Sequence, residues 1–534
     1  MIPTIQILVV LLVVIAGVAL VAERLKLPPA ILLVLAGVML ALFPGLPNVR
    51  LAPEFVLLFV LPPIIYSSAV AMSWREFRFN LRPISLLAVG CVLFTTAAAA
   101  AVTHWLLGFS WSLGFLLGAI VSPPDAVAPL SIARRMQLPR RLVVILEGEG
   151  LANDASALIL YRFAIAAVSF SVFSWSQAAG MFAAIIGGEI LWGIGVGWLM
   201  LRLRRWVHDT RIEITLSVLT PFVAYWPPEY LGGSGVLATV TAGLYISWNG
   251  LRLIGAATRL QGIFFWDFLI YLTEGFVFLI TGLQARTLIA GIRGDSLSDL
   301  AASAAVVCAV VIMARFVWMF PATYLPRWLM PSIARKDPAP PWQWPFALAF
   351  TGIRGSVSLA AALAIPLTTE SGASFPERDR ILFLTFSVIL VTLVGQGLLL
   401  PAVIRALGLA NTGRRERHAD RVEEFAARRL AIEAARGRLD ELAAERELPE
   451  DLLRPLRQRH HDRLKNVEHR SDGDESHKRA VEQHDEIEFL LIEAERQRIN
   501  DLYRAGKLKD EARRRIEREL DLREALLTNL RAAE

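Results

Sequence analysis

The stretch Leu146 to Leu158, LEGEGLANDASAL, places three carboxylates and an amide inside an apolar segment long enough to cross a membrane. We expect a helix from about residue 142 to residue 168. At about 1.5 Å per residue, Asp154 would lie roughly 20 Å along it, near the middle of a bilayer core about 30 Å thick. An ionised side chain at that depth costs at least a few kcal/mol, which favours a functional role. The alternative for any single acid is a buried structural salt bridge.

The composition divides the chain into two parts. Hydrophobic residues make up 55% of its 534 residues, too many for a soluble protein of this size. Residues 411–534 hold 28 of the 55 Lys and Arg and 30 of the 49 Asp and Glu. We therefore predict a membrane domain over 1–410 and a charged cytoplasmic tail over 411–534. The positive excess lies in short membrane loops, so it does not indicate nucleic-acid binding. Cys91 and Cys308 fall in apolar spans and suggest neither a disulfide nor a metal site.

Apolar runs predict an all-α polytopic protein with about thirteen spans. The first run lacks a small-residue cleavage pattern, so we expect it to be retained as a span. The runs lie near residues 2–21, 28–45, 52–72, 83–107, 111–134, 141–168, 178–203, 211–228, 230–249, 260–285, 299–325, 341–368 and 378–408.

Basic residues alternate between the loops, which predicts the orientation. Every second loop is rich in arginine, whereas the intervening loops hold few basic residues. By the positive-inside rule, the amino terminus lies outside and the tail lies in the cytoplasm. The basic loops carry Arg24 and Lys26; Arg75, Arg78 and Arg82; Arg134, Arg135, Arg140 and Arg141; Arg202, Arg204, Arg205 and Arg211; Arg252 and Arg259; and Arg327, Arg335 and Lys336. The intervening loops carry Arg50, Arg286, Arg293, Arg378 and Arg380.

Two of the spans are expected to be discontinuous. The fifth reads GFLLGAIVSPPDAVAPLSIARR, where prolines interrupt the helix around Asp125. The twelfth reads WPFALAFTGIRGSVSLAAALAIP and breaks around Arg354. Non-helical backbone at membrane depth survives where it lines a cavity or is covered by protein. The two broken spans, the fifth and the twelfth, are seven spans apart. If they are equivalent members of a structural repeat, spans four to six correspond to spans eleven to thirteen. Paired broken segments of this kind indicate a transporter's binding site between inverted repeats.

Asp125 and Asp154 can meet at the midplane and hold either a dehydrated monovalent cation or a proton. Desolvation and a second nearby acid favour the protonated form, so the two ions would compete for one site. Asn153 can add a neutral carbonyl oxygen, and Ser122 with broken-helix carbonyls can complete a shell suited to a hard cation such as sodium. Asp125 and Asp154 are thus the expected ligands of the transported cation, and we expect no catalytic residues and no cofactor.

Other charged residues in the spans are expected to be structural. An unpaired Arg315 in the eleventh span would be very costly, so we predict that it pairs with Glu149. Arg354 is expected to stabilise the break in the twelfth span, through backbone carbonyls or through an acid such as Glu147. The sequence gives no partner for Glu189 or Glu274.

The tail is helical in pattern, with interruptions at Pro449 and at residues 471–476. Its helices would pack on one another or on a partner chain, or would form a solvated appendage. Six of the eight histidines lie in the tail. They allow a pH-sensing role for the tail, and the alternative is that they are exposed and titrate without a function. They are His418, His460, His461, His469, His477 and His484.

Five motifs in order resemble those of bacterial sodium/proton antiporters of the monovalent cation:proton antiporter-1 family. They are LPPIIYSSA (61–69), SPPDAVAP (122–129), GEGLANDASAL (148–158), FLITGLQ (278–284) and GIRGSVSLAAALA (352–364). The resemblance covers residues 1–410 and implies a thirteen-span homodimer with crossed broken helices in the bacterial inner membrane. It implies that Asp154 and Asn153 form the ion site with Asp125 and that Glu149 pairs with Arg315. The Asn-Asp pair implies electroneutral one-for-one exchange, serving pH and cation homeostasis.

Three positions depart from the family pattern. Many relatives have serine where this chain has Gly150 and threonine where it has Pro124, and some have an acid where it has Ser67. Each change removes an oxygen ligand or an acid, so the coordination shell and the choice among sodium, potassium and lithium stay open.

Functions of other classes are weaker alternatives. An intramembrane aspartyl hydrolase using Asp125 and Asp154 would leave the broken helices and the Glu149–Arg315 pair without a role. A cation channel or sensor is a third alternative. No P-loop is present that would indicate transport driven by nucleotide hydrolysis.

Overall fold

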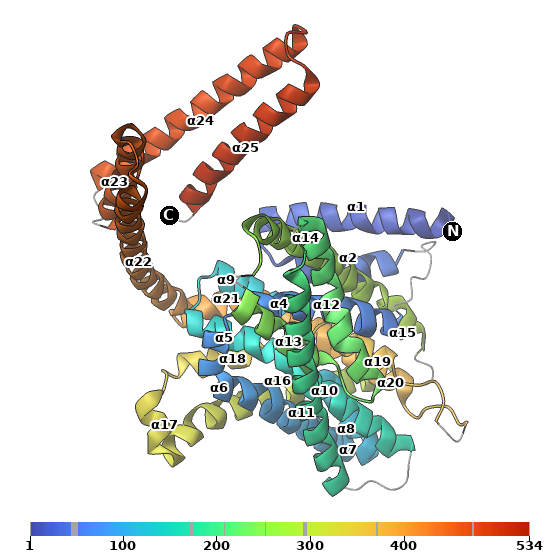
Figure 1. The fold of residues 1–534 in the computed structure, drawn as a ribbon. Coiled ribbons are helices and arrows are strands. Elements are labelled where there is room, and N and C mark those ends of the chain that lie inside the picture. The colour runs from blue at the N-terminus through green and yellow to red at the C-terminus, as the bar shows by residue number, and fades with distance from the viewer. Residues whose placement is uncertain are drawn as a thin grey trace. The chain divides into compact units, whose positions relative to one another are not determined.

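A computed structural model describes residues 2–43, 52–169, 175–207, 209–250, 253–291, 296–369, 372–471 and 475–532. Their regular elements are helices, as the apolar periodicity predicts. The chain forms two compact units, Met1–Arg414 and Arg415–Glu534. Figure 1 shows the helices of both units. The prediction of orientation also used three arginines that lie outside the described residues. They are Arg50, Arg252 and Arg293.

Eight helical segments in the described part of the chain are long and apolar enough to cross a membrane. Two shorter apolar helices are α2 (Pro29–Ala41) and α8 (Trp111–Val121). The number of thirteen spans stays a prediction. The eight segments are Gln6–Leu25, Pro53–Ala71, Leu81–Leu107, Arg140–Val168, Gly180–Arg204, Ala256–Leu288, Ser298–Leu329 and Arg378–Ala406.

Their elements are α1 (Ile2–Leu25), α3 (Pro53–Phe55), η1 (Val56–Val60), α4 (Leu61–Ala71), α6 (Leu81–Ser85), η2 (Leu86–Cys91), α7 (Val92–Leu107), α10 (Arg140–Ser169), α11 (Trp175–Arg204), α14 (Ala256–Leu283), α15 (Ala285–Gly291), α16 (Leu297–Leu329), α20 (Arg378–Leu390), η4 (Val391–Gln396) and α21 (Gly397–Ala406). The remaining elements of the first unit are α5 (Trp74–Phe79), α9 (Val127–Arg135), α12 (Thr210–Tyr230), α13 (Val236–Asn249), α17 (Pro331–Lys336), α18 (Gln343–Phe350) and α19 (Ser356–Leu363).

Local residue chemistry sets the corner between α7 and α8. Gly108 follows α7 with φ 72°, a left-handed conformation that glycine adopts without steric cost. Ser110 then begins α8, and its hydroxyl accepts a hydrogen bond from the Leu113 backbone N–H at 3.4 Å. The sequence Gly-Phe-Ser thus turns the chain back so that α7 and α8 pack together.

Two glycines let the backbones of α2 and α14 touch. A Cβ at Gly37 would lie 2.3 Å from the Leu279 carbonyl oxygen, and one at Gly282 would lie 2.2 Å from the Val34 carbonyl oxygen. Small residues at such crossings allow close helix packing without a hydrophobic driving force from water. Any larger residue at either position would force the two helices apart.

Glu189 on α11 joins this helix to the start of α13. Its carboxylate accepts hydrogen bonds from the backbone N–H groups of Ser234 (2.6 Å), Gly235 (3.2 Å) and Leu237 (3.1 Å). The first-turn N–H groups of a helix lack partners within the helix. A buried carboxylate at this place gives these N–H groups an acceptor, and they give the carboxylate its donors. This acid is therefore held by backbone groups.

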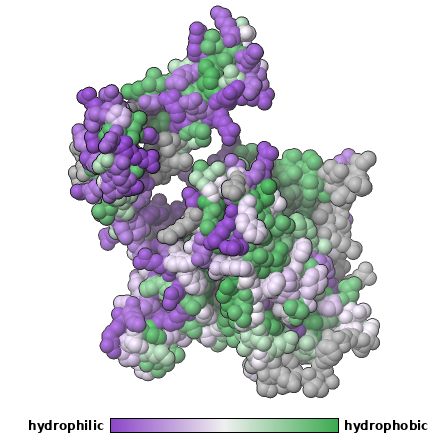
Figure 2. Space-filling model, viewed as in Figure 1, coloured by the Kyte–Doolittle hydropathy of each residue, from purple (hydrophilic) through white to green (hydrophobic). Residues whose placement is uncertain are grey.

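The second unit contains the helical tail. Its elements include most of α22 (Leu409–Arg446), followed by α23 (Glu450–Ser471), α24 (Glu475–Arg504) and α25 (Asp510–Ala532). The interruption predicted at Pro449 is confirmed, since α22 ends three residues before it. Arg496 on α24 pairs with Asp521 and Glu524 on α25, and Figure 1 shows these two helices antiparallel. Figure 2 shows their mainly hydrophilic surface. The side chains of His469, His477 and His484 lie outside the described part.

Candidate ion-binding site

The two predicted helix breaks are present and touch each other. α8 ends at Val121 and α9 begins at Val127, while α18 ends at Phe350 and α19 begins at Ser356. The Asp125 backbone N–H donates to the Ile353 carbonyl oxygen at 2.7 Å. Each break thus supplies a partner for a backbone group that helical bonding leaves free, as a buried interruption requires.

Arg354 stabilises the breaks through backbone carbonyls. Its buried guanidinium donates to the carbonyl oxygens of Val121 at 2.9 Å and Ser122 at 3.4 Å, and also to that of Gly352. The alternative partner, Glu147, is wrong for a physical reason: it pairs with Arg134 at 2.8 Å, an arginine 65% exposed at the helix end. Glu147 thus has its charge partner on α9, whereas Arg354 donates to backbone carbonyls.

Asp125 presents one carboxylate oxygen that is free to bind an ion. Its Oδ1 accepts a hydrogen bond from the Val127 backbone N–H at 3.0 Å, which caps the start of α9. Its Oδ2 is buried and has no hydrogen-bond partner among the described residues. A Cβ at Gly355 would lie 2.0 Å from this oxygen. The absence of a side chain at 355 therefore makes room for the carboxylate between the two breaks.

Asn153 and Asp154 approach the first break from α10. The Asn153 amide nitrogen donates to the Pro124 carbonyl oxygen at 2.7 Å, which leaves its Oδ1 buried and without a partner in the described part of the chain. Asp154 is half-buried and lines a cavity of about 10 Å³ with Pro123, Tyr161 and Ser358 among others. That volume is about the size of one water molecule. Two side chains of α10 thus face the break that carries Asp125.

Ser122 lies at the same break. Its hydroxyl donates to the Ala119 carbonyl oxygen at 3.3 Å, and its own carbonyl oxygen accepts from Arg354. The hydroxyl oxygen keeps its lone pairs, because donation uses only its hydrogen.

Glu149 and Arg315 form a buried two-bond ion pair between α10 and α16. The Arg315 Nη2 donates to the Glu149 Oε2 at 2.8 Å, and a second bond joins Nη1 to Oε1. Both side chains are at most 2% exposed. The Arg315 Nε also donates to the Leu348 carbonyl oxygen at 3.1 Å, which extends the contact to α18. Planar paired donors of this kind are the geometry that arginine offers a carboxylate.

The structure gives a physical reason for the glycine at position 150. A Cβ there would lie 2.4 Å from the Ala126 Cβ, next to Asp125. A serine at this position would not fit into this packing without a shift of Ala126 at the start of α9. Ser67 lies half-buried on α4, and Pro124 supplies the carbonyl that Asn153 binds. Glu274 lies half-buried on α14.

One residue of the site carried no signal in the sequence. Thr392 lies in η4, a π-helical segment of the span that continues from α20. Its hydroxyl oxygen accepts from the Arg354 backbone N–H at 3.0 Å while donating to the Val388 carbonyl oxygen at 2.7 Å. π-Helical turns often mark functional sites, but they have no sequence pattern strong enough to find them.

The arrangement suits the binding of one small hard cation or a proton. Within the described part of the chain, a carboxylate oxygen and an amide oxygen are buried without hydrogen-bond partners, and a second carboxylate lies on the residue after the amide. Unsatisfied buried oxygens are costly, and a bound cation or proton removes that cost. Oxygen ligands favour hard cations such as sodium over soft metals.

Comparisons with known proteins identify the family of the chain. The chain matches the family described as "Sodium/hydrogen exchanger, transmembrane" over residues 8–406. An uncharacterised Na+/H+ exchanger of Mycobacterium tuberculosis (strain H37Rv) is 34% identical over 96% of this chain and 94% of its own length. The Na+/H+ antiporter NhaS2 of Synechocystis is 30% identical over 94% of this chain and 90% of its own length.

Another relative and a solved structure widen the comparison. A sodium, potassium, lithium and rubidium/H+ antiporter of Bacillus subtilis is 33% identical over 70% of this chain and 57% of its own length. The structure of the sodium proton antiporter MjNhaP1 from Methanocaldococcus jannaschii superposes with a TM-score of 0.63 at 19% identity, over 76% of this chain and 98% of that one. The fold, the paired helix breaks and the match over residues 8–406 together show that this chain belongs to the sodium/hydrogen exchanger family of membrane transporters.

Proposed function

We propose that this protein exchanges a monovalent cation, Na+ in the first place, for H+ across the membrane by alternating access. The observation that carries the proposal is a pair of buried oxygens on Asp125 and Asn153 that have no hydrogen-bond partner among the described residues. They lie next to Asp154, where two broken helices meet. Cation and proton compete for these oxygens, so release of one permits binding of the other. One exchangeable carboxylate beside a neutral amide fits electroneutral one-for-one exchange.

The membrane setting follows from the same proposal. We place the protein in a bacterial inner membrane as a homodimer, with the amino terminus outside and the tail in the cytoplasm. The arginine-rich loops support this orientation. In this setting the exchanger would serve pH and cation homeostasis.

Cation-dependent pH change in everted vesicles tests the function. We expect addition of Na+ to dissipate a preformed proton gradient in vesicles that contain the protein and not in matched vesicles without it. Electroneutral exchange would be unaffected by collapsing the membrane potential with valinomycin and potassium. A conductance without proton movement would indicate a channel, and absence of any ion exchange would overturn the proposal.

A broader cation range is a second candidate. The B. subtilis relative is named for sodium, potassium, lithium and rubidium exchange. This chain also has Gly150 and Pro124, neither of which offers a hydroxyl ligand. Measuring proton movement against Na+, K+ and Li+ in turn separates the two candidates. Equal responses to all three would favour the broad antiporter.

Replacing Gly355 by alanine is expected to abolish most of the exchange. The new Cβ would lie 2.0 Å from the Asp125 Oδ2, so the carboxylate or the break must move. A misplacement of about 1 Å in a positioned group is enough to cost large factors in rate. Gly195→Ala on α11, where a Cβ would meet nothing within 4 Å, is the matched control. If Gly355→Ala exchanges ions as fast as the natural protein, the position of the Asp125 carboxylate is not important for transport.

Removing the charged tail tests whether it regulates transport. We expect deletion of residues 415–534 to leave exchange in place and to shift its pH profile or its rate. The reason is that the site lies within the unit Met1–Arg414. The measurement is the vesicle assay at a series of pH values, with membrane insertion checked by protein level. Complete loss of exchange by correctly inserted protein would make the tail part of the transport mechanism.

A further inference from the structure

A second charged site lies apart from the ion-binding site, where three helices bring arginines to one acid. Arg82 on α6, Arg141 on α10 and Arg327 on α16 all contact Asp337, which follows α17. Their Nη atoms lie 2.5, 2.8 and 2.8 Å from its carboxylate oxygens, respectively. The exchange mechanism uses none of these residues.

One carboxylate neutralises only one of the three positive charges. Burial acts to raise the pKa of Asp337, but the hydrogen bond and charge of Arg141, with the charges of Arg327 and Arg82, hold this pKa below its ordinary value. Asp337 is therefore ionised at neutral pH, and the group keeps an excess of two positive charges. The Arg82 and Arg141 side chains are 28% and 25% exposed, so part of each reaches the surface. The Arg141 Nε also donates to the Asn80 Oδ1 at 3.0 Å.

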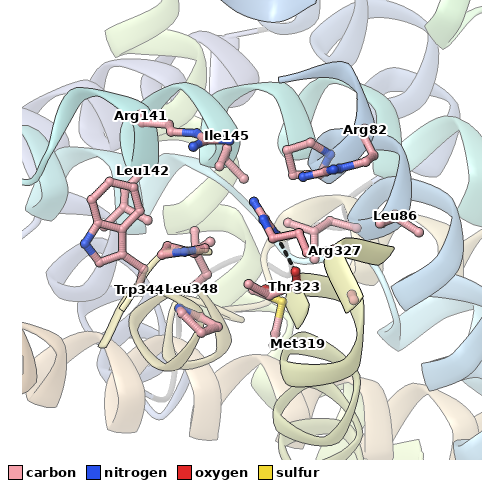
Figure 3. Close-up of a pocket in the computed structure, with 15 residues that line it drawn as sticks. Arg82, Leu86, Arg141, Leu142, Ile145, Met319, Thr323, Arg327, Trp344 and Leu348 are labelled. Carbon is pink, nitrogen blue, oxygen red and sulfur yellow. Dashed lines mark hydrogen bonds between the residues drawn. The ribbon is translucent and has the colours of Figure 1, made fainter. Parts of the chain in front are cut away.

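The arginines border a cavity with apolar walls. It has a volume of about 40 Å³, room for about three water molecules. Figure 3 shows Arg82, Arg141 and Arg327 converging on one side of it. The remaining labelled lining residues are Leu86, Leu142, Ile145, Met319, Thr323, Trp344 and Leu348.

Exposed apolar side chains occur next to the arginines in the sequence. Phe79 is exposed and lies under the Arg141 guanidinium, whose carbon is 5.5 Å from the ring centroid. Trp328 follows Arg327 directly and is 79% exposed, and Trp342 is exposed just before α18. Aromatic side chains with this exposure are typical of the level of lipid headgroups in a bilayer. A ligand at this place would have both a charged part and an apolar part.

We propose that this cluster of Arg82, Arg141 and Arg327 is a binding site for the phosphate headgroup of an anionic phospholipid. Basic pockets between spanning helices on the cytoplasmic side bind such headgroups, and all three arginines belong to the basic stretches that the sequence assigns to that side. Guanidinium groups match phosphate oxygens in geometry and charge. The bound phosphate would join α6, α10 and α16, because each contributes one arginine. The proposal does not depend on which cation is exchanged.

Native mass spectrometry of the full-length protein with added lipid tests the site. We expect phosphatidylglycerol to bind more tightly than phosphatidylcholine with the same acyl chains. Arg82→Gln should weaken phosphatidylglycerol binding by about fivefold, the effect of one basic residue at an anionic lipid surface. Arg78→Gln removes the same charge from an exposed position four residues earlier and is the matched control, which should leave binding unchanged.

Asp337→Asn distinguishes a lipid-binding site from a cluster with a purely structural role, because only a lipid-binding site would bind lipid more tightly after this change. It removes the competing carboxylate, so phosphatidylglycerol should bind more tightly than to the unaltered protein. If this variant does not fold, as judged by its melting temperature, the comparison of Arg82→Gln with Arg78→Gln decides alone. The proposal is overturned if these two variants lose equal affinity, if phosphatidylcholine binds as tightly, or if millimolar inorganic phosphate displaces the lipid, since a free anion would then be the ligand.

Discussion

Asp154→Asn is expected to reduce cation-dependent proton movement to the level of vesicles that lack the protein. Asparagine has the same shape as aspartate, but it carries no negative charge and releases no proton in the physiological range. The variant would keep the amide and carbonyl contacts around the first break, because Asn153 makes the hydrogen bond to Pro124. We therefore expect a folded protein without exchange, measured as the fluorescence change of a pH-sensitive dye in everted vesicles.

A matched control separates this effect from a general loss of charge on α10. Glu147→Gln removes a carboxylate from the same helix, but this acid pairs with the exposed Arg134 and lies away from the break. We expect Glu147→Gln to retain exchange at normal protein levels. Full exchange by Asp154→Asn would overturn the assignment of the site.

Breaking the Glu149–Arg315 pair is expected to have the largest effect on stability. Removing one partner of a buried ion pair leaves an uncompensated charge and typically costs about 3–5 kcal/mol. Glu149→Ala and Arg315→Ala should each lower the melting temperature of the detergent-solubilised protein and the amount inserted in the membrane. Arg134→Ala breaks the pair between Arg134 on α9, which is 65% exposed, and Glu147 on α10, and should cost about 1 kcal/mol or less.

Two double variants distinguish pairing from independent roles. Glu149→Leu with Arg315→Leu leaves no buried charge and should be more stable than either single alanine variant. The exchange Glu149→Arg with Arg315→Glu should also exceed the singles, yet fall below the natural protein. The reason is that a glutamate at 315 cannot donate to the Leu348 carbonyl oxygen, as the Arg315 Nε does. Double variants no more stable than the singles would contradict the pairing.

Much of the site is predictable from the cost of burying polar groups. Prolines around Asp125 and glycines around Arg354 mark breaks because they act locally on the backbone, and the structure contains both breaks. Arg315 needed an acid within reach, and Glu149 is in contact with it. Such inferences succeed where the energetic cost of one residue, such as a proline in a helix or a buried arginine, by itself indicates what must surround it.

The features that depend on the fit between distant segments are not predictable in this way. The Glu189 carboxylate accepts hydrogen bonds from three backbone N–H groups near residue 235. Backbone partners of this kind leave no pattern of side chains in the sequence from which they could be predicted. Gly150 looks like the loss of a hydroxyl, whereas its Cβ position is filled by Ala126. Arg354 had two reasonable partners, and only the register of the two breaks selects carbonyls over Glu147.

The contacts among the two breaks, α10 and α16 have a mechanical consequence. Asp125 is tied to Ile353, Arg354 to Val121, Asn153 to Pro124 and Arg315 to both Glu149 and Leu348. We expect the movement of the proposed exchange to carry the ligands and their supports together, because these bonds join them. The ion would then keep the same coordination on both faces, so its dissociation constant should be equal from inside and outside.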